Sequence, residues 1–195
     1  MKKLIFATNN RHKVEEIRSI SELSYEIVSL KEAGIIIDIP EPYNTLQENA
    51  REKASVIYKL TGEDCFSEDT GLEVAALNGE PGVKSARYAG EENSFIKNTE
   101  KLLFNMKGVE NRNARFRTVL ALFLNGAEYY FEGICKGTIL ADSKGTGGFG
   151  YDPVFLPLGA QKTFAEMDLE EKNEYSHRKK AMDKLVSFLN KSATT

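Results

Sequence analysis

The stretch TGGFGYD at residues 146–152, continued by PVFLP at residues 153–157, decides between two fold classes. Together with Gly145, its glycines satisfy the G-x-G-x-x-G pattern that binds dinucleotides at the start of a helix. The two prolines that follow bracket three apolar residues, so they favour a short strand and no helix. The glycines let backbone N–H groups approach a ligand closely, and Phe149 and Tyr151 offer flat faces. The stretch thus argues against a Rossmann-type fold and is equipped for a nucleotide, with an ordinary glycine-rich turn as the alternative.

Strands and helices alternate along the first half of the chain. Residues 3–7 are predicted to form a strand, and Asn9 or Asn10 caps the helix that follows, with Val14 and Ile17 on its inner face. A strand is predicted over residues 24–30, and a helix begins at a capping box of Thr45 and Glu48. A short strand is predicted over residues 65–69. A further helix starts at Asn93 and ends at Gly108, with Ile96, Thr99, Leu103 and Met106 along its length.

An antiparallel pair and two helices are predicted in the second half. Asn125-Gly126 is the dipeptide that a type I′ hairpin turn favours, and it joins predicted strands over residues 116–124 and 128–134. A short helix is predicted over residues 168–174, followed by a Ser176-capped helix. The order predicts a mixed α/β fold with helices on its central sheet, in one domain spanning residues 1–195.

Composition narrows the class of partner. The net charge of −3 and the isoelectric point near 5.6 offer no basic field for nucleic acid. Lys2 and Lys3 precede an apolar stretch of only four residues, which is too short for a signal peptide or a membrane span. We therefore expect a cytoplasmic protein with no nucleic-acid polymer and no membrane as partner. Cys65 and Cys135 fit no metal-binding spacing, so we expect buried thiols.

The segment TNNRHK at residues 8–13 follows the first predicted strand and opens the first helix. Backbone donors, a hydroxyl, two amides and two cations at a helix start suit a polyphosphate. Taken alone, plain helix capping with solvated basic residues explains the segment better, because it contains no Walker motif. His12 is interpreted as a surface or capping histidine, since no partner for catalysis stands at a useful spacing.

Three carboxylates and one lysine are further candidates for the site. Glu68 and Asp69 are predicted at a strand end before a turn at Thr70-Gly71, and neighbouring strand residues point to opposite faces. Asp69 is favoured for the pocket, with an Asx-turn acceptor as the alternative. Glu41, in a loop between two prolines, is a possible second oxygen ligand for Mg²⁺, which needs only one or two carboxylates when phosphate completes its shell. Lys53 either extends along the apolar stripe of its helix or reaches a phosphate.

Taken together, these segments resemble one family. TNNRHK, SEDTGLEVAALNGEPGVKSARYAG at residues 67–90, GGFGYDPVF and EKNEYSHRKKA occur in the order and spacing of the inosine triphosphate pyrophosphatases, from Lys3 to about Leu189. The resemblance implies a mixed, elongated sheet with two lobes around a nucleotide cleft, a homodimer, and Mg²⁺ dependence. It also implies hydrolysis of the non-standard purine nucleotides ITP, dITP and XTP to the monophosphate and pyrophosphate.

The resemblance also implies roles for single residues. Asp69 is the proton acceptor and a metal ligand, Glu41 is the second metal ligand, and Lys53 is a phosphate or catalytic lysine. Substrate contacts fall on Thr8, Asn9, Asn10, Arg11, His12, Lys13, Thr70, Phe149, Gly150, Tyr151, Asp152, Lys172, His177 and Arg178. The departures from the family pattern are small: Asn9 replaces a glycine of many relatives, which leaves the loop conformation open, Thr70 replaces a serine, and Glu68 replaces an aspartate.

Hydrogen-bond polarity predicts the choice of base. A 6-oxo purine accepts hydrogen bonds from Arg178 and nearby N–H groups, whereas the 6-amino group of adenine would set donor against donor, at a cost of about 1 to 3 kcal/mol per unsatisfied group. Two alternatives remain: a related pyrophosphatase for modified pyrimidine or methylated nucleotides, which a substrate panel would separate, and a non-catalytic nucleotide sensor, which would need neither Asp69 nor a metal.

Overall fold

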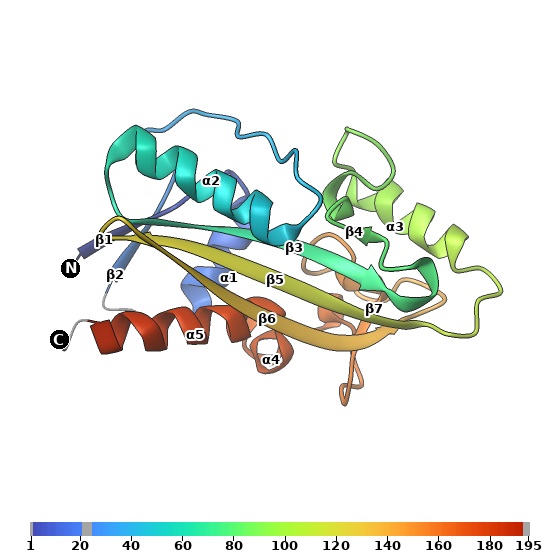
Figure 1. The fold of residues 1–195 in the computed structure, drawn as a ribbon. Helices are drawn as coiled ribbons and strands as arrows, with labels where there is room; N and C mark the ends of the chain where they lie inside the picture. Colours follow the sequence, from blue (N-terminus) through green and yellow to red (C-terminus); the bar gives the residue numbers. More distant parts are fainter. Residues whose placement is uncertain (1, 21–24, 193–195) are drawn as a thin grey trace. The chain divides into compact units, whose positions relative to one another are not determined.

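The computed structural model describes residues 2–20 and 25–192 and has the predicted mixed α/β architecture (Figure 1). Ser24, at the start of one predicted strand, lies outside the described residues. The elements in chain order are β1 (Lys2–Phe6), α1 (Arg11–Ile20), β2 (Tyr25–Ser29), α2 (Leu46–Thr61), β3 (Cys65–Val74), β4 (Pro81–Gly82), α3 (Phe95–Asn105), β5 (Asn113–Leu124), β6 (Ala127–Ile139), β7 (Phe155–Pro157), α4 (Leu169–Tyr175) and α5 (His177–Ser192).

The chain forms two compact units. Unit 1 comprises Met1–Asp69, Thr118–Gly133 and Arg178–Thr195, and unit 2 comprises Thr70–Arg117 and Ile134–His177. Strands β3, β5 and β6 contribute residues to both. The prediction of a single domain over residues 1–195 stays a prediction.

Unit 1 is a sheet covered by helices on both faces. Strand β1 pairs in parallel with β2 and with β3, and the rings of Phe6 and Phe66 stack at 4.4 Å between centroids. Successive strand residues point to opposite faces, so Leu4 and Phe6 pack with α1 and α5, whereas Ile5 packs with α2 (Figure 1). Ala50, Ala54 and Ile57 form the predicted stripe of α2, and all are fully buried. The hairpin at Asn125-Gly126 has positive φ at both residues, which confirms the type I′ prediction.

Unit 2 has a core of its own between α3 and the strand segments that belong to this unit. Leu72 and Val74 of β3, Leu102 and Met106 of the α3 region, and Phe155 of β7 are completely buried in it. Strand β7 pairs antiparallel with β6, which confirms the prediction of a short strand after the glycine-rich stretch. The region from Tyr151 to Val154 contains only a short 3₁₀ turn, so the glycines do not open a long helix.

Two expectations from the sequence are wrong. Strand β3 does not end at Asp69 but continues to Val74, and Gly71 lies within it. A Cβ atom at Gly71 would come within 2.5 Å of the carbonyl oxygen of Gly82, so this glycine permits the close approach of the β4 backbone rather than a turn.

Helix α3 starts at Phe95 with Ser94 as its cap, two residues later than expected. Of the side chains expected along this helix, Thr99 and Met106 are buried and Leu103 packs against the core. Leu102 is completely buried, whereas Ile96 is 73% exposed.

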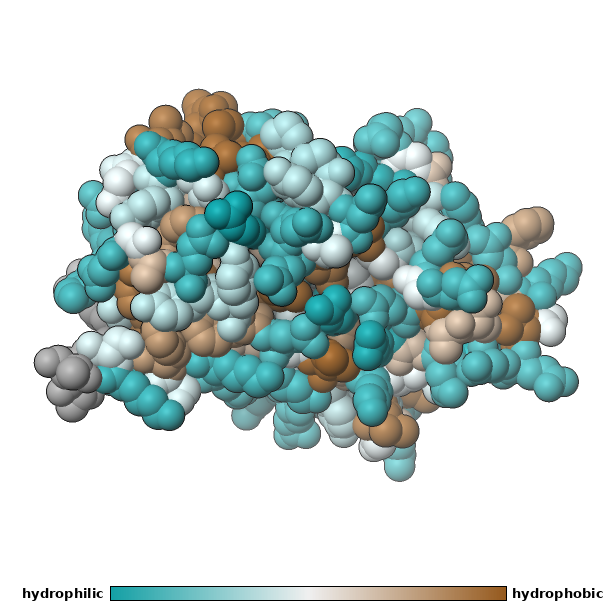
Figure 2. Space-filling model, viewed as in Figure 1, coloured by the Kyte–Doolittle hydropathy of each residue, from teal (hydrophilic) through white to brown (hydrophobic). Residues whose placement is uncertain are grey.

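The loop between β2 and α2 in unit 1 carries exposed apolar side chains. Ile36 is fully exposed in the segment between β2 and α2, and Figure 2 shows hydrophobic residues over the part of the view where this loop runs in Figure 1. Within the described residues, none of the helices combines the length and the apolar character that crossing a membrane requires.

Candidate active site

The segment from Thr8 to Lys13 turns the chain from the end of β1 into α1. The hydroxyl oxygen of Thr8 accepts a hydrogen bond from the backbone N–H of Asn10 at 3.1 Å. The side-chain oxygen of Asn10 in turn accepts from the backbone N–H of Lys13 at 3.2 Å, which confirms Asn10 as the helix cap. Short polar side chains therefore hold the loop at the helix N-terminus, where backbone N–H groups and the helix dipole favour an anion.

The other side chains of this segment point in different directions. Asn9 stands where many relatives have glycine. Its side chain donates to the carbonyl oxygen of Ile37 at 2.8 Å and so connects the segment to the loop between β2 and α2. The side chain of Arg11 is 86% exposed and pairs with Glu15, and that of His12 is 51% exposed beside the same glutamate. Lys13 is the basic residue of the segment that turns inward.

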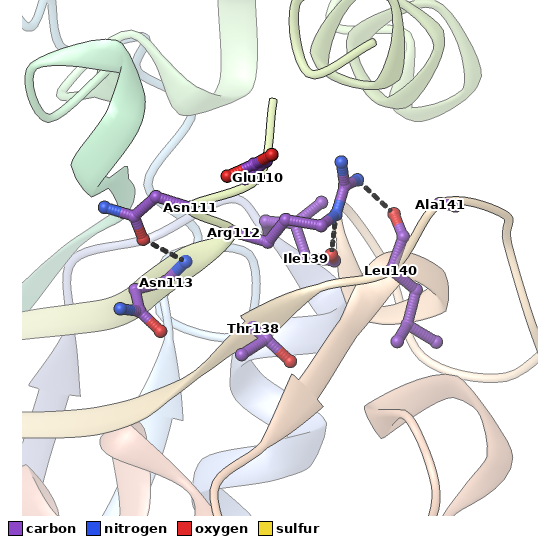
Figure 3. Close-up of a pocket in the computed structure, with 8 residues that line it drawn as sticks. All are labelled: Glu110, Asn111, Arg112, Asn113, Thr138, Ile139, Leu140 and Ala141. Carbon is purple, nitrogen blue, oxygen red and sulfur yellow. Dashed lines mark hydrogen bonds between the residues drawn. The ribbon is translucent and has the colours of Figure 1, made fainter. Parts of the chain in front are cut away.

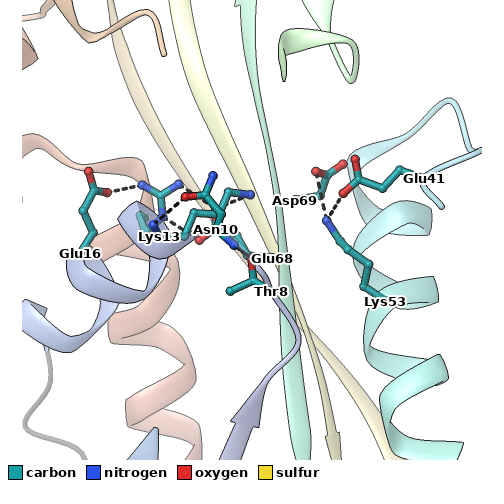
Figure 4. Close-up of polar contacts among 9 residues, drawn as sticks. Thr8, Asn10, Lys13, Glu16, Glu41, Lys53, Glu68 and Asp69 are labelled. Carbon is teal, nitrogen blue, oxygen red and sulfur yellow. Dashed lines mark hydrogen bonds and ion pairs between the residues drawn. The ribbon is translucent and has the colours of Figure 1, made fainter. Parts of the chain in front are cut away.

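Lys13 ends a buried chain of charges that we call the ion network, formed by Glu16, Arg178, Glu68 and Lys13 (Figure 4). Arg178 holds Glu68 with two parallel hydrogen bonds, from Nε at 2.6 Å and from Nη2 at 2.7 Å, and its Nη1 donates to Glu16. Lys13 Nζ lies 3.2 Å from Glu68 Oε1. Burial alone would lower the pKa of Arg178, but the charges of Glu68 and Glu16 outweigh it and raise that pKa.

A second cluster joins the loop before α2, α2 itself and β3. The ammonium group of Lys53 donates to the carboxylate of Glu41 and lies 3.5 Å from Oδ1 of Asp69 (Figure 4). Burial opposes the charge of Lys53, but the carboxylates of Asp69 and Glu41 outweigh it, and the pKa of Lys53 is raised. Lys53 therefore stays a cation at neutral pH. The side chain is buried against these carboxylates and does not merely extend along the helix, and its phosphate role stays a prediction.

Among the buried carboxylates of the described residues, Asp69 is the one with a buried oxygen that lacks a hydrogen-bond partner. Its Oδ2 is buried without a hydrogen bond. Burial raises the pKa of Asp69, and the positive charges of Lys53 and Lys13 offset this only in part. Glu68, one residue earlier in β3, faces the ion network on the other side of the strand, as the alternation of strand residues predicts (Figure 4).

The described residues contain no cluster of three or more His, Cys, Asp or Glu side chains that could hold a metal ion. Two carboxylates are sufficient for Mg²⁺ when the phosphate oxygens of a substrate and water complete its shell. Asp69, with its unpaired oxygen, and Glu41, on the same ammonium group, are hard oxygen donors of the required kind. The residues present therefore fit a divalent cation that arrives with its nucleotide.

In unit 2 the glycine-rich stretch forms a loop closed by Asp152. The carboxylate oxygen Oδ2 of Asp152 accepts from the backbone N–H of Phe149 at 2.9 Å and from Lys172 Nζ at 2.6 Å. Gly148 has a φ of 68°, and a Cβ atom there would overlap the carboxylate of Asp152, so only glycine fits. Lys172 Nζ also lies 5.4 Å from the ring centroid of Phe149. The loop and α4 therefore bring together the ring of Phe149, the carboxylate of Asp152 and the buried ammonium group of Lys172.

The remaining predicted residues of unit 2 pack more deeply. Tyr151 is buried, its hydroxyl donates to the carbonyl of Ser85 at 2.8 Å, and burial raises its pKa. The carbonyl of Gly150 lies 3.4 Å from the hydroxyl of Thr99. His177 is 3% exposed, and its ring stacks on Phe116 at 4.7 Å between centroids.

The predicted residues thus fall into separate groups. Unit 1 brings together Thr8, Asn10, Lys13, Glu41, Lys53, Asp69 and Arg178, whereas Arg11 and His12 face outward. Unit 2 brings together Phe149, Asp152 and Lys172, while Thr70 directly follows Asp69 within β3. The side chains of Lys172, His177 and Arg178 are buried, so these three residues do not form a solvated basic edge.

Two residues of the ion network were not predicted as site residues. The sequence leaves Glu68 as an alternative to Asp69 and, beside Glu41, as an alternative second metal ligand, and it predicts no role for Glu16. A signal for Glu16 existed, because it stands three residues after Lys13 and thus on the same helix face. Its partner Arg178 is 162 residues away in the sequence, and no local pattern could have joined them.

A surface hollow of about 440 Å³ in unit 2 contains none of the predicted site residues (Figure 3). It is lined by residues 110–113 and 138–141. Its arginine, Arg112, donates to the carbonyl oxygens of Met106, Ile139 and Leu140 at 2.9, 2.5 and 2.7 Å. These bonds tie the start of β5 to the end of β6, so we interpret Arg112 as structural.

Comparisons with known proteins agree with the fold. A model of the Ham1 family matches residues 4–188. The dITP/XTP pyrophosphatase of Porphyromonas gingivalis is 53% identical over 97% of this chain and 98% of that protein, and that of Flavobacterium johnsoniae is 49% identical over 96% and 97%. Among solved structures, the Ham1 protein of Staphylococcus aureus superposes with a TM-score of 0.88 at 36% identity, over 98% of this chain and 100% of that one. The nucleoside-triphosphatase / dITP/XTP pyrophosphatase of Mycobacterium abscessus gives 0.76 at 38% identity, over 94% and 98%.

Proposed function

The chain belongs to the Ham1 family, and from this membership we propose that it is a nucleoside triphosphate pyrophosphatase. It hydrolyses non-standard purine nucleoside triphosphates, namely dITP, XTP and ITP, to the monophosphate and pyrophosphate, and so removes them from the nucleotide pool. The observation that carries the proposal is Asp69, a buried carboxylate with one unpaired oxygen beside a buried lysine. Its raised pKa suits a proton acceptor that works near neutral pH.

The triphosphate is assigned to unit 1. Its charge meets the backbone N–H groups at the start of α1, the ammonium of Lys13 and that of Lys53. Thr8 and Asn10 fix the backbone of this loop, and their side chains are already engaged in doing so. The exposed Arg11 and His12 contribute long-range attraction rather than close contacts.

Asp69 and Glu41 are the residues that would hold Mg²⁺. When bound, such an ion neutralises phosphate charge and acidifies the attacking water. Asp69 orients that water and takes its proton. A bond forms between the water oxygen and the α-phosphorus, the bond from the α-phosphorus to the bridging oxygen breaks, and pyrophosphate leaves. Lys53 and Lys13 offset the charge that builds up on the phosphate oxygens.

The base is assigned to unit 2. A purine stacked on Phe149 would lie next to the ammonium of Lys172, which donates hydrogen bonds and cannot accept them. A 6-oxo group accepts from this donor, whereas the 6-amino group of adenine does not. Asp152 holds both the ammonium and the loop. Tyr151 and His177 pack in the core of the same unit, and we assign backbone and hydroxyl contacts to Gly150 and Thr70.

Arg178, which the sequence suggested as a base contact, is 1% exposed and directs three nitrogen atoms to carboxylates of unit 1. We therefore assign it to the triphosphate side of the site, where it acts through Glu68 and Lys13. A homodimer remains part of the proposal through the resemblance alone, and a cytoplasmic location remains an expectation from the sequence. Light scattering after size-exclusion chromatography measures the oligomeric state.

The test is a product assay across a nucleotide panel. The purified chain is incubated with dITP, XTP, ITP, dATP, dGTP and a modified pyrimidine triphosphate, with Mg²⁺ or with EDTA. We expect pyrophosphate and the monophosphate from the 6-oxo substrates, little turnover of dATP, and loss of activity in EDTA that Mg²⁺ restores. Orthophosphate as the first product, or nucleotide binding without any hydrolysis, would contradict the proposal.

A further inference from the structure

The ion network contains one carboxylate that the proposed mechanism does not use. Glu16 lies on the buried face of α1, is 5% exposed, and accepts a hydrogen bond from Nη1 of Arg178. We propose that Glu16 is a positioning residue that places the ammonium of Lys13 for the triphosphate, acting through Arg178 and Glu68. This inference rests on the proposed function, because it takes the triphosphate as the ligand of Lys13.

The first step of the argument is charge. The four members alternate in sign along the network, and two carboxylates balance two cations. Arg178 is the centre and is 1% exposed, so water cannot replace a lost partner. Its planar guanidinium holds Glu68 through two bonds and directs its third nitrogen to Glu16. The orientation of this plane therefore depends on carboxylates at both ends.

The second step is a shared oxygen atom. Oε1 of Glu68 accepts from Arg178 Nη2 at 2.7 Å and lies 3.2 Å from Lys13 Nζ. A shift of the guanidinium moves this oxygen, and the lysine follows it. The side chain of Lys13 is 14% exposed, whereas those of Glu68 and Arg178 are 0% and 2% exposed. Lys13 is thus the member through which the network meets a ligand.

The third step predicts what the loss of Glu16 does. Without this charge, the network carries an excess positive charge, which does not weaken the attraction of a polyphosphate. Arg178 then has only Glu68 as a carboxylate partner within the network, and Lys13 competes with it for the same oxygen. The lysine loses its fixed place, so the turnover number falls while the Michaelis constant for the nucleotide changes little. A purely structural role would lower stability and leave the turnover of the folded enzyme unchanged.

The experiment compares Glu16→Gln with Glu16→Asp and with the control Glu128→Gln. Glu128, like Glu16, is paired with an arginine: it accepts two bonds from Arg51, both at 2.8 Å, but it lies at the surface and has no place in the proposed site. Pyrophosphate release from dITP gives kcat and KM, and urea unfolding shows which variants are folded.

We expect kcat of Glu16→Gln to fall about tenfold or more, within the roughly hundredfold that a misplacement of 1 Å can cost. Its KM should stay within about threefold of the parent value. Glu16→Asp, which keeps the charge on a shorter side chain, should have an intermediate kcat, and Glu128→Gln should match the parent.

The outcomes separate the two proposals. If the parent chain does not release pyrophosphate from dITP, the proposed function fails. If the parent is active and folded Glu16→Gln has its kcat, the positioning role is refuted. If Glu16→Gln does not fold, Glu16→Asp decides: a reduced kcat with normal KM supports the role, and a parental kcat overturns it.

Discussion

Replacing Asp69 with asparagine should abolish turnover and also stabilise the fold. The change keeps the size of the side chain and removes its charge and basicity. A lost general base typically costs about 10² to 10⁴ in rate. Because Asp69 is also an expected metal ligand, we expect kcat to fall by at least about a hundredfold.

The stability gain follows from the raised pKa of Asp69, which burial causes. A carboxyl whose pKa is higher in the folded than in the unfolded state favours folding in its neutral form, so its ionisation costs stability. Each unit of difference corresponds to about 1.4 kcal/mol. This cost is absent below the unfolded pKa of about 4 and is fully present above the folded pKa. The asparagine variant should therefore be more stable than the parent near neutral pH.

Two measurements test these statements together. Pyrophosphate release at neutral pH measures the loss of turnover, and urea unfolding near pH 4 and near pH 8 measures the stability difference, which should grow with pH. Asp142→Asn, at an exposed position outside the site, is the matched control and should change neither quantity. A folded Asp69→Asn variant with near-parental kcat would refute the catalytic role. A variant less stable than the parent at both pH values would refute the electrostatic account.

Three further changes test other parts of the molecule. Phe149→Ala should raise the KM for dITP, since stacking of a base on an aromatic ring contributes about 1 to 3 kcal/mol. The affinity for inorganic tripolyphosphate, measured by calorimetry, should not change. Equal losses for both ligands would refute the assignment of the base to Phe149. Gly71→Ala should destabilise the fold by about 2 kcal/mol or more in urea unfolding, because the added Cβ atom in β3 would meet the carbonyl of Gly82 in β4; parental stability would show that this approach is not tight. Lys13→Met should lower kcat/KM about tenfold or more, because the side chain of Lys13 turns inward to the ion network. His12→Ala should lower kcat/KM less than about threefold, because the side chain of His12 is exposed. Similar losses for the two variants would argue against the inward role of Lys13.

Local signals in the sequence were sufficient for most of the fold. The capping boxes, the hydrophobic stripe of α2 and the Asn125-Gly126 turn act over a few residues, so their physics is visible in the sequence. Gly71 shows the limit. Thr70-Gly71 resembles a turn locally, but the reason for the glycine is the backbone of Gly82, which tertiary folding brings within contact. Ile96 shows the same limit, since the burial of an apolar residue in the first turn of a helix depends on which other segments pack there.

The candidate site was predictable where neighbours in sequence act together and unpredictable where they do not. Asn10 and Lys13 are joined by a helix cap, and the opposite faces of Glu68 and Asp69 follow from strand geometry. The partners of Arg178 do not follow from any local rule. The sequence placed Arg178 with His177 because the two are adjacent, yet the guanidinium binds carboxylates of β3 and α1 in unit 1.

The environments of three carboxylates discriminate among candidates for the general base. Glu68 accepts two bonds from Arg178 and lies 3.2 Å from Lys13, so both of its oxygen atoms already contact cations. Glu41 pairs with Lys53 at a more exposed position, where its side chain is 28% exposed, and is better suited to holding a cation than to taking a proton from buried water. Asp69 combines burial, an incompletely offset desolvation cost and a free oxygen. A base must gain from protonation and must have an atom available for it, and Asp69 is the carboxylate of this cluster that meets both conditions.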